Sequence, residues 1–286
     1  MPFLRRPNAE IYFEVHGDGP DLMFLHGADG NGASWWEQVS HFSQNYRCIV
    51  ADNRYFGRSR AEIEDSLDAD SFLDDAVALL DQLSVEQVGL VCQSLGGWTG
   101  LRLALNFPRR VWGLVSSNSP MGIDLDTAVG DIKRFSGQKE EQTMAIEIAA
   151  LSEQFRRESP DLFLLYKQIG SFNTLAKSEI NGRPFFSALT SAVLDPDFLI
   201  PPADLESLLA PILLIGGTHD PLYSATTARS VAELFNSSRL HIFEEVGHSP
   251  YFETPKQFNS LVDEFLSKCL QERIGENLKQ ISGRII

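Results

Sequence analysis

The chain has 286 residues, of which 43% are hydrophobic and 22% charged, and its formal net charge at pH 7 is −15. This acidic balance argues against nucleic acids and anionic membrane surfaces as partners, because both require clustered basic residues. Three scattered cysteines are too few for a disulfide framework or a zinc cluster. No stretch has the pattern of a secretory signal or a membrane span. We therefore expect a soluble cytoplasmic protein. The sequence leaves open whether it is a monomer or a homodimer.

Short β-rich segments alternate with amphipathic helical segments on both sides of a central region. This alternation is typical of an α/β fold with a mostly parallel, roughly eight-stranded sheet flanked by helices. The expected strands are 11–15, 22–25, 47–51, 88–91, 111–116, 212–215 and 240–243. The expected helices are 35–42, 72–83, 95–106, 226–235 and 256–270. In the second of these helices, five apolar residues repeat at helical spacing and should face the sheet: Phe72, Ala76, Leu79, Leu80 and Leu83.

Residues 121–202 break this alternation, with helix-like segments at 143–157, 160–169 and 185–192 but no convincing strand. An insertion of this length between two core strands is best interpreted as a helical lobe. We therefore predict a core of residues 1–120 and 203–286 and a helical cap of residues 121–202. Seven phenylalanines and Tyr166 in the cap form either the core of the lobe or the lining of a pocket. Beyond residue 271 we expect a peripheral helix or a loose tail.

Ser94 stands where the apolar segment 88–91 breaks sharply into the expected helix 95–106. Such a turn forces the serine backbone into a strained conformation and leaves its hydroxyl clear of the sheet edge, at the N-terminus of the helix. A serine hydroxyl is a weak nucleophile by itself. It needs a base, an acid that orients the base, and donors for the developing oxyanion.

Asp220 and His248 are the candidate acid and base. Asp220 follows an apolar strand and a Gly-Gly pair, which places its carboxylate just past the carboxyl end of that strand. His248 lies in a glycine- and proline-containing loop after the last expected strand. A turn aspartate and a structural loop histidine are the alternative interpretations. The end of the strand at 111–116 holds Ser117-Asn118-Ser119, with no acid before Asp124, so we select Asp220 as the acid.

The loop at 26–30, with the sequence His-Gly-Ala-Asp-Gly, follows the second expected strand. Its glycines let the backbone approach a ligand closely, so the amide groups of Ala28 and Leu95 are the candidate oxyanion donors. We expect His26 to hold this loop by hydrogen bonds, and the Asp29 side chain to point to solvent or to cap a turn. A phosphate-binding loop is disfavoured because no Gly-Lys-Ser/Thr sequence follows.

Together these residues resemble the α/β-hydrolase fold superfamily. The matching motifs, in chain order, are His26-Gly27, Asp52-x-Arg54-x-x-Gly57-x-Ser59, Ser94-Leu95-Gly96-Gly97, Asp220 and Gly247-His248. The resemblance spans residues 10–270, and the order Ser…Asp…His is that of the family, with room for a cap between the serine and the acid. Within the superfamily, the chain resembles bacterial small-molecule carboxylesterases and enol-lactonases with a helical cap.

Two residues depart from the family pattern. Cys92 stands where the family usually has glycine, and is expected to tighten the packing of the turn. Tyr55 also replaces a usual glycine, so that Tyr55-Phe56 is expected to shape a wall near the entrance of the site. A serine rather than an aspartate at position 94 argues against dehalogenase and epoxide-hydrolase chemistry.

The resemblance and the residues predict a cofactor-free, metal-free serine hydrolase that cleaves a small, largely apolar carboxylic ester or lactone through an acyl-enzyme. Ser94 is the predicted nucleophile, His248 the base and Asp220 the acid. The residues expected to contact the substrate are His26, Trp98, Phe163, Tyr166 and Phe186. Two alternatives stay open: hydrolysis of a carbon–carbon bond in vinylogous diketone ring-fission products, and a non-hydrolytic ligand receptor that keeps the fold.

Overall fold

The computed structural model describes residues 3–28, 30–62, 70–136, 146–173, 179–180 and 183–282. Asp29 lies outside the described residues, and so do residues 63–69, which precede the helix starting at Asp70.

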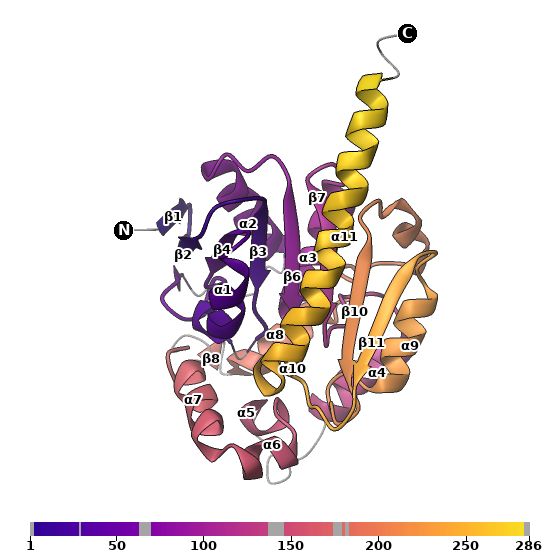
Figure 1. Cartoon of the computed structure of the whole chain (residues 1–286). Helices are drawn as coiled ribbons and strands as arrows, with labels where there is room; N and C mark the ends of the chain where they lie inside the picture. Colours follow the sequence, from indigo (N-terminus) through magenta and orange to yellow (C-terminus); the bar gives the residue numbers. More distant parts are fainter. Residues whose placement is uncertain are drawn as a thin grey trace.

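A single large sheet runs through the centre of the molecule (Figure 1). Among the described residues it has nine strands, in the spatial order β1 (Phe3–Arg6), β2 (Ala9–His16), β4 (Arg47–Ala51), β3 (Asp21–Leu25), β6 (Val88–Gln93), β7 (Val111–Ser117), β10 (Ile212–Gly217) and β11 (Ser238–Phe243), with β5 (Arg60–Ala61) paired to β2. Each pair from β4 to β11 is parallel, whereas β2 runs antiparallel to its neighbours β1 and β4. The predicted mostly parallel α/β sheet is confirmed.

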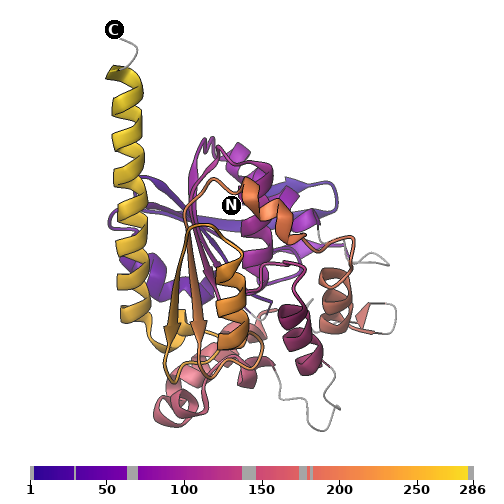
Figure 2. The same cartoon turned by 90° about the vertical axis from the view of Figure 1, so that its right-hand side faces the viewer.

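Helices cover both faces of the sheet (Figure 2). One face carries α2 (Asp70–Gln82), α3 (Leu95–Asn106) and α9 (Ala225–Glu233), and the other carries α1 (Trp36–Phe42), preceded by the 3-10 helix η1 (Gly32–Trp35), and α11 (Pro255–Ser282). Strand alternation divides the core between them: in β3, Met23 and Leu25 pack into one cluster, whereas Leu22 and Phe24 pack into the other. Burial of each such side chain contributes about 1.5–3 kcal/mol to folding.

The predicted sheet-facing stripe of α2 is confirmed for Ala76, Leu79 and Leu80, which are buried in the sheet cluster, and for Leu83, which is partly buried just past the helix end. Phe72 is also buried, but it belongs to a separate cluster with Tyr55, whose ring centroid is 6.4 Å away. The helix expected at 256–270 continues as α11 to Ser282, which agrees with the first of the two alternatives considered beyond residue 271, a peripheral helix. Among the described residues, no helix combines the length and the apolar character that a membrane crossing requires.

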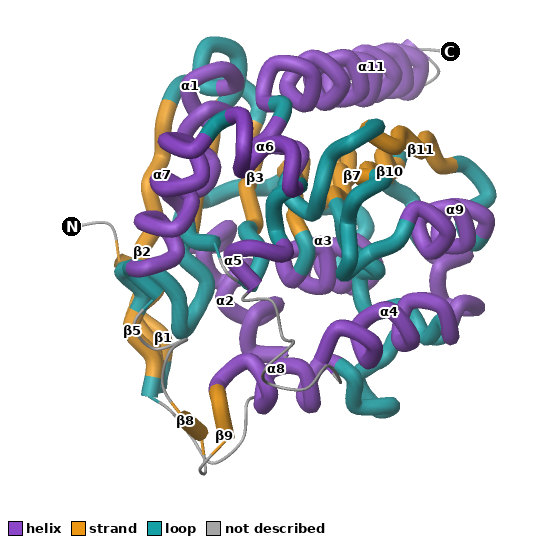
Figure 3. Tube along the Cα trace, turned by 90° about the horizontal axis from the view of Figure 1, so that it is seen from below, coloured by secondary structure: helices purple, strands orange, loops and turns teal. Residues whose placement is uncertain are grey.

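The segment after β7 lies beyond the carboxyl ends of the parallel strands (Figures 1 and 3). It contains α4 (Asp126–Ser136), α5 (Ile146–Ala149), α6 (Glu153–Glu158), α7 (Pro160–Ser171), α8 (Phe185–Val193) and the hairpin β8 (Glu179–Ile180) and β9 (Arg183–Pro184), and the 3-10 helix η3 (Pro202–Ser207) follows it. The helix expected at 143–157 is interrupted, because Ser152 caps α6 by accepting a hydrogen bond from the Phe155 amide at 3.2 Å. Neither α4 nor the short hairpin was expected from the sequence.

Replacing either of two helix glycines by alanine should change stability, in opposite directions. Gly96 in α3 lies against β3, and a Cβ atom there would stand 2.1 Å from the Leu25 carbonyl oxygen, whereas a Cβ at Gly130 in α4 would meet nothing within 4 Å. We expect Gly96→Ala to lower the free energy of unfolding by more than about 2 kcal/mol, because α3 must move off the sheet. Gly130→Ala should raise it by about 0.5–1 kcal/mol. Chemical denaturation measures both changes, and equal effects would contradict the close packing of α3.

Candidate active site

Ser94 occupies a strained turn between β6 and α3. Its backbone has φ 48° and ψ −117°, a region that non-glycine residues rarely adopt. Three hydrogen bonds hold this turn: the Ser94 amide donates to the Ser117 carbonyl at 3.0 Å, and the Ser94 carbonyl accepts from the Gly97 amide at 2.9 Å and from the Ser119 hydroxyl at 2.6 Å. The side chain lies at the N-terminus of a twelve-residue helix and faces a cavity, where the helix dipole favours developing negative charge.

Cys92 packs against a glycine of the helix that follows the turn. A Cβ atom on Gly100 would stand 2.5 Å from the Cys92 sulfur, so the cysteine fills space that the glycine leaves free. Burial raises the pKa of the Cys92 thiol, which favours its neutral form. Cys92 therefore acts as a small hydrophobic side chain, and Gly100 is the neighbour that accommodates it.

His248 and Asp220 form a hydrogen-bonded pair at the carboxyl end of the sheet. The His248 Nδ1 atom lies 2.8 Å from Asp220 Oδ2, and both side chains are buried. The other carboxylate oxygen accepts hydrogen bonds from the amides of Leu222 at 2.8 Å and Tyr223 at 3.1 Å. A carboxylate only accepts, so His248 carries its proton on Nδ1 and leaves Nε2 free to accept one.

Asn118 belongs to this site but was not predicted from the sequence. Its Nδ2 donates to the same Asp220 Oδ2 atom at 2.8 Å, and to the Gly247 carbonyl at 3.2 Å. It adopts φ 51°, a left-handed conformation that asparagine tolerates better than most residues. The signal that could have identified it is the polar Ser-Asn-Ser run at the end of a buried strand, where an asparagine can support an acid that another strand supplies.

Two further contacts hold the His248 loop. Gln93, next to the serine, donates to the His248 carbonyl at 3.2 Å, and the Tyr166 hydroxyl of α7 lies 3.2 Å from the Ser249 hydroxyl. The loop is thus tied both to the serine turn and to the segment above the sheet.

The amides of Ala28 and Leu95 flank the same cavity, which both residues line. Within the described residues, neither amide donates to a carbonyl among the turn and loop backbone hydrogen bonds. The first amide of a helix has no partner inside that helix, which leaves Leu95 available to a ligand.

His26 lies behind this loop rather than in the cavity. Its Nδ1 is 2.7 Å from the Gly27 carbonyl, and its Nε2 accepts from the Asn53 amide at 2.8 Å. Burial lowers the pKa of His26, which keeps the ring neutral. Asp52 holds the adjoining turn by accepting from the amides of Gly32 and Arg58, each at 2.7 Å. His26 thus supports the loop, as expected, and the Asp52 motif stabilises a turn.

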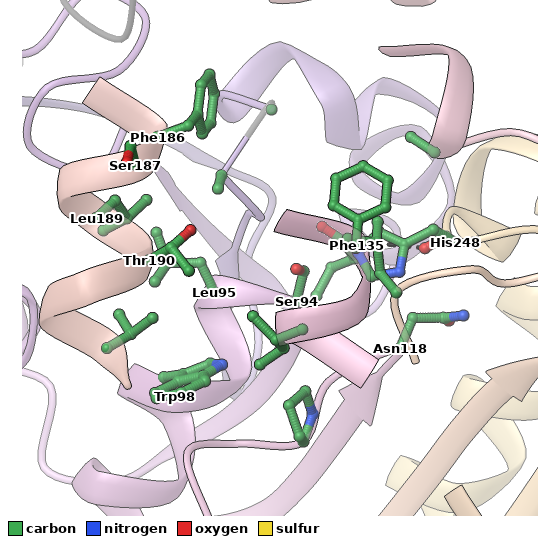
Figure 4. A pocket seen from close by; sticks show the side chains of 18 of the residues that line it. Ser94, Leu95, Trp98, Asn118, Phe135, Phe186, Ser187, Leu189, Thr190 and His248 are labelled. Carbon is green, nitrogen blue, oxygen red and sulfur yellow. Dashed lines mark hydrogen bonds between the residues drawn. The ribbon is translucent and has the colours of Figure 1, made fainter. Parts of the chain in front are cut away.

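The cavity above Ser94 has a volume of about 460 Å³, within the range of small-molecule sites. Figure 4 shows Ser94 with Leu189 and Thr190 of α8 on one side and His248 and Asn118 on the other. None of the described lining residues is Asp, Glu, Lys or Arg, and most of the wall is apolar. Of the residues expected to contact substrate, Trp98, Tyr166 and Phe186 line the cavity, whereas His26 and Phe163 do not.

The phenylalanines of the segment 121–202 serve both of the roles considered. Phe135 and Phe186 line the cavity, whereas Phe155 and Phe163 pack against the hydrophobic cluster that includes Phe252 of α10 (Pro250–Glu253). Phe185 contacts the aromatic pair Tyr55-Phe56, with ring centroids 5.6 and 5.7 Å away, so that pair anchors α8 instead of lining the cavity itself.

The sequence matches a protein-family model, and both the sequence and the fold are similar to those of known hydrolases. The family model described as alpha/beta hydrolase fold matches residues 20–255. The chain is 30% identical over 266 residues to the pimeloyl-(acyl-carrier protein) methyl ester esterase of Nitrosomonas europaea, covering 89% of this chain and 99% of that protein. It is 27% identical over 274 residues to the 2-hydroxymuconate semialdehyde hydrolase of a Pseudomonas species, covering 91% and 92%. Among solved structures, an N-acyl homoserine lactone degrading enzyme superposes with a TM-score of 0.73 at 26% identity, covering 92% of this chain and 100% of that one.

Proposed function

Because the chain belongs to the α/β hydrolase fold family, we propose that it is a serine hydrolase of small, neutral, largely apolar esters or lactones. Ser94 is the nucleophile, His248 the general base and Asp220 the acid that orients it. The observation that carries this proposal is the shared position of Ser94 and His248 on one cavity, with the His248 Nδ1 atom held by Asp220 at 2.8 Å.

The reaction proceeds in two steps through an acyl-enzyme. Ser94 Oγ attacks the carbonyl carbon while His248 Nε2 takes its proton, and Asp220 stabilises the resulting imidazolium. The amides of Ala28 and Leu95 donate to the oxyanion, and each such donor is worth roughly 3 kcal/mol of transition-state stabilisation. His248 then protonates the departing alcohol oxygen. Water, deprotonated by the same imidazole, attacks the acyl carbon and releases the acid and free Ser94. None of these steps uses a cofactor or a metal.

The segment 121–202 acts as the cap of this site, and residues 1–120 and 203–286 form the catalytic core. Support comes from its contribution to the cavity wall: Ile132 and Phe135 of α4, Tyr166 of α7 and Leu189 of α8 all line it. Substrate size and shape are then set by the cap, whereas the chemistry is set by the core.

The lining favours an uncharged substrate. Without a Lys or Arg among the described lining residues, a carboxylate on the acyl chain loses its water shell and gains no ionic partner. The hydroxyl groups of Ser187 and Thr190 on α8 offer neutral hydrogen bonds at the far wall instead. A lactone with a polar but uncharged substituent, such as the class named for the acyl homoserine lactone degrading relative, fits this description.

Two p-nitrophenyl esters of similar length test this preference. We expect p-nitrophenyl butyrate to be hydrolysed about 100-fold faster than mono-p-nitrophenyl succinate, because burial of an unpaired carboxylate costs about 3 kcal/mol or more. Initial rates at pH 7.5 give the two kcat/KM values. Comparable values would show that a cation reaches the acyl chain, and would contradict the neutral-substrate assignment.

Hydrolysis of a carbon–carbon bond is the second candidate, and the similarity to 2-hydroxymuconate semialdehyde hydrolase favours it. A fluorophosphonate probe followed by a panel of esters, lactones and vinylogous diketones separates the possibilities. Labelling of Ser94 with turnover of esters or lactones supports our proposal. Turnover confined to the diketones would replace it with the second candidate. A protein that binds these ligands without labelling or turnover would be a receptor that keeps the fold.

A further inference from the structure

Glu253 is a partly buried carboxylate beside the candidate base, and the proposed reaction does not use it. It ends the short helix α10 (Pro250–Glu253). Its Oε1 accepts a hydrogen bond from the Gly247 amide at 2.9 Å, and its Oε2 accepts one from the Ser152 hydroxyl at 2.6 Å. Removing a carboxylate from water is costly unless hydrogen bonds compensate, and here each of its oxygens accepts one.

The residue preceding His248 is held from both sides. Glu253 binds the amide of Gly247, while Asn118 donates to the Gly247 carbonyl at 3.2 Å. A Cβ atom on Gly247 would stand 2.9 Å from Glu253 Oε1 and 2.7 Å from the Ser152 amide nitrogen, so only glycine fits this space. The position of the His248 backbone is therefore set by the contacts of Gly247.

Ser152 connects the same carboxylate to the segment above the sheet. It is the N-cap of α6, and its hydroxyl accepts from the Phe155 amide at 3.2 Å while donating to Glu253. Ala150, two residues earlier, lines the cavity. Through these hydrogen bonds Glu253 connects the loop that carries His248 to one wall of the cavity.

We propose that Glu253 is a positioning residue for His248: it holds Gly247 in place and sets a negative charge beside the base loop. The inference rests on the proposed role of His248 as general base. A negative charge near the imidazole stabilises the imidazolium that forms when the serine gives up its proton. Glu253 acts only through His248 and does not contact the reacting atoms, since it does not line the cavity.

The charge of Glu253 changes near neutral pH. Burial, and to a smaller extent the charge of Asp220, raises the pKa of Glu253 to about 7, against the opposing effect of the hydrogen bonds from Ser152 and Gly247. Among the described residues, the neighbouring elements carry His219 and Asp220 after β10, Glu245 and His248 in the loop, and Glu153, Arg156, Arg157 and Glu158 in α6. The Arg156 Nε donates to the Ser152 carbonyl at 3.4 Å and not to Glu253.

A fluorophosphonate inactivation assay tests the inference without knowledge of the substrate. We expect Glu253→Gln to lower the second-order inactivation rate about tenfold at pH 8.5, well below the 10²–10⁴-fold contribution of a general base itself. The ratio of wild-type to variant rates should approach one at pH 5.5 and rise through about pH 7, because the wild-type carboxylate is charged only above its pKa of about 7. Ser152→Ala is the matched control: it keeps the carboxylate but removes one donor to its charged form, so the rise should move to higher pH.

As the pH rises, the thermal stability of the wild type relative to Glu253→Gln should fall, whereas its relative inactivation rate should rise. The pKa of Glu253 is raised in the folded state above its usual value of about 4.3, so the folded protein binds the extra proton between these values. Its contribution to stability is therefore greatest at low pH and is lost as the pH rises through about 7. Glutamine does not titrate, so the melting temperature of Glu253→Gln relative to wild type should increase from pH 5 to pH 8.

The outcomes separate this inference from the proposed function. A wild-type protein that resists the probe would overturn the serine-hydrolase proposal. A wild-type protein that reacts, with a wild-type to Glu253→Gln ratio that stays constant with pH, would overturn the role of Glu253 alone. Parallel loss of activity and melting temperature at every pH would also overturn it, because that result describes a merely structural side chain.

Discussion

Replacement of Ser94 by alanine should lower kcat for a neutral ester by about 10⁶-fold, the loss found when a serine nucleophile that acts as a unit with its base is removed. In the proposed mechanism this hydroxyl forms the covalent bond to the acyl group, and it stands on the strained turn with φ 48° at the start of α3. Hydrolysis of p-nitrophenyl butyrate measures the loss, and mass spectrometry of the fluorophosphonate adduct shows whether labelling disappears with it.

A second serine that lines the cavity provides a control for this substitution. Ser187 of α8 also lines the cavity, but it lies on the wall across from His248 (Figure 4). Ser187→Ala should keep the fluorophosphonate adduct and change kcat by less than about tenfold, the scale of one lost neutral hydrogen bond. Labelling that survives in Ser94→Ala, or that is lost in Ser187→Ala, would place the nucleophile elsewhere. The melting temperature of Ser94→Ala should stay close to that of wild type.

The sheet and the positions of the candidate-site loops could be predicted from the sequence because each signal is local. Short apolar or β-rich segments of four to six residues that alternate with helix-like segments indicated the seven expected core strands. Ser94, Asp220 and His248 each directly follow such a segment, or lie a few residues past it. Parallel strands place their carboxyl ends at one edge, which explains why residues 94, 220 and 248 lie together.

The supporting residues were missed because their roles depend on contacts between distant segments, and the only local signal was the polar Ser-Asn-Ser run around Asn118. Glu253 accepts from the Gly247 amide and Asn118 donates to the Gly247 carbonyl, a relation that no sequence spacing encodes. The strand β1 was missed because two arginines follow its two apolar residues, which leaves no clear alternation. Phe163 was expected in the cavity on composition alone, but it packs against the hydrophobic cluster that includes Tyr251 and Phe252 of α10.

Cys92, which replaces a usual glycine of the family, fits because a neighbouring glycine leaves space for its side chain. The sequence indicated tighter packing at this position, and the structure identifies Gly100, in the second turn of α3, as the residue that provides the space. A larger residue at position 100 would press on the cysteine and move the helix that carries the Leu95 amide. The pair is thus best understood as one packing unit under the serine turn.

Asp220→Asn should lower kcat by about 10⁴-fold while leaving the fold intact, because the substitution removes the charge and also disturbs the tautomer of the base. Asp220 Oδ2 accepts from His248 and Asn118, and Oδ1 accepts from the Leu222 and Tyr223 amides, so all four neighbouring groups are donors. The amide nitrogen introduced by the substitution must face one of these pairs.

Either orientation of the introduced amide is unfavourable. Its nitrogen on the Oδ1 side meets two backbone N–H groups and opens the turn after β10. Its nitrogen on the Oδ2 side donates to His248 Nδ1, which moves the imidazole proton to Nε2, where it can no longer accept the Ser94 proton. Asn118→Ala is the matched control: it removes one donor to Oδ2 but keeps the carboxylate, so kcat should fall only about tenfold. Similar losses in the two variants, measured with p-nitrophenyl butyrate, would show that Asp220 acts by packing and not by fixing the tautomer of His248.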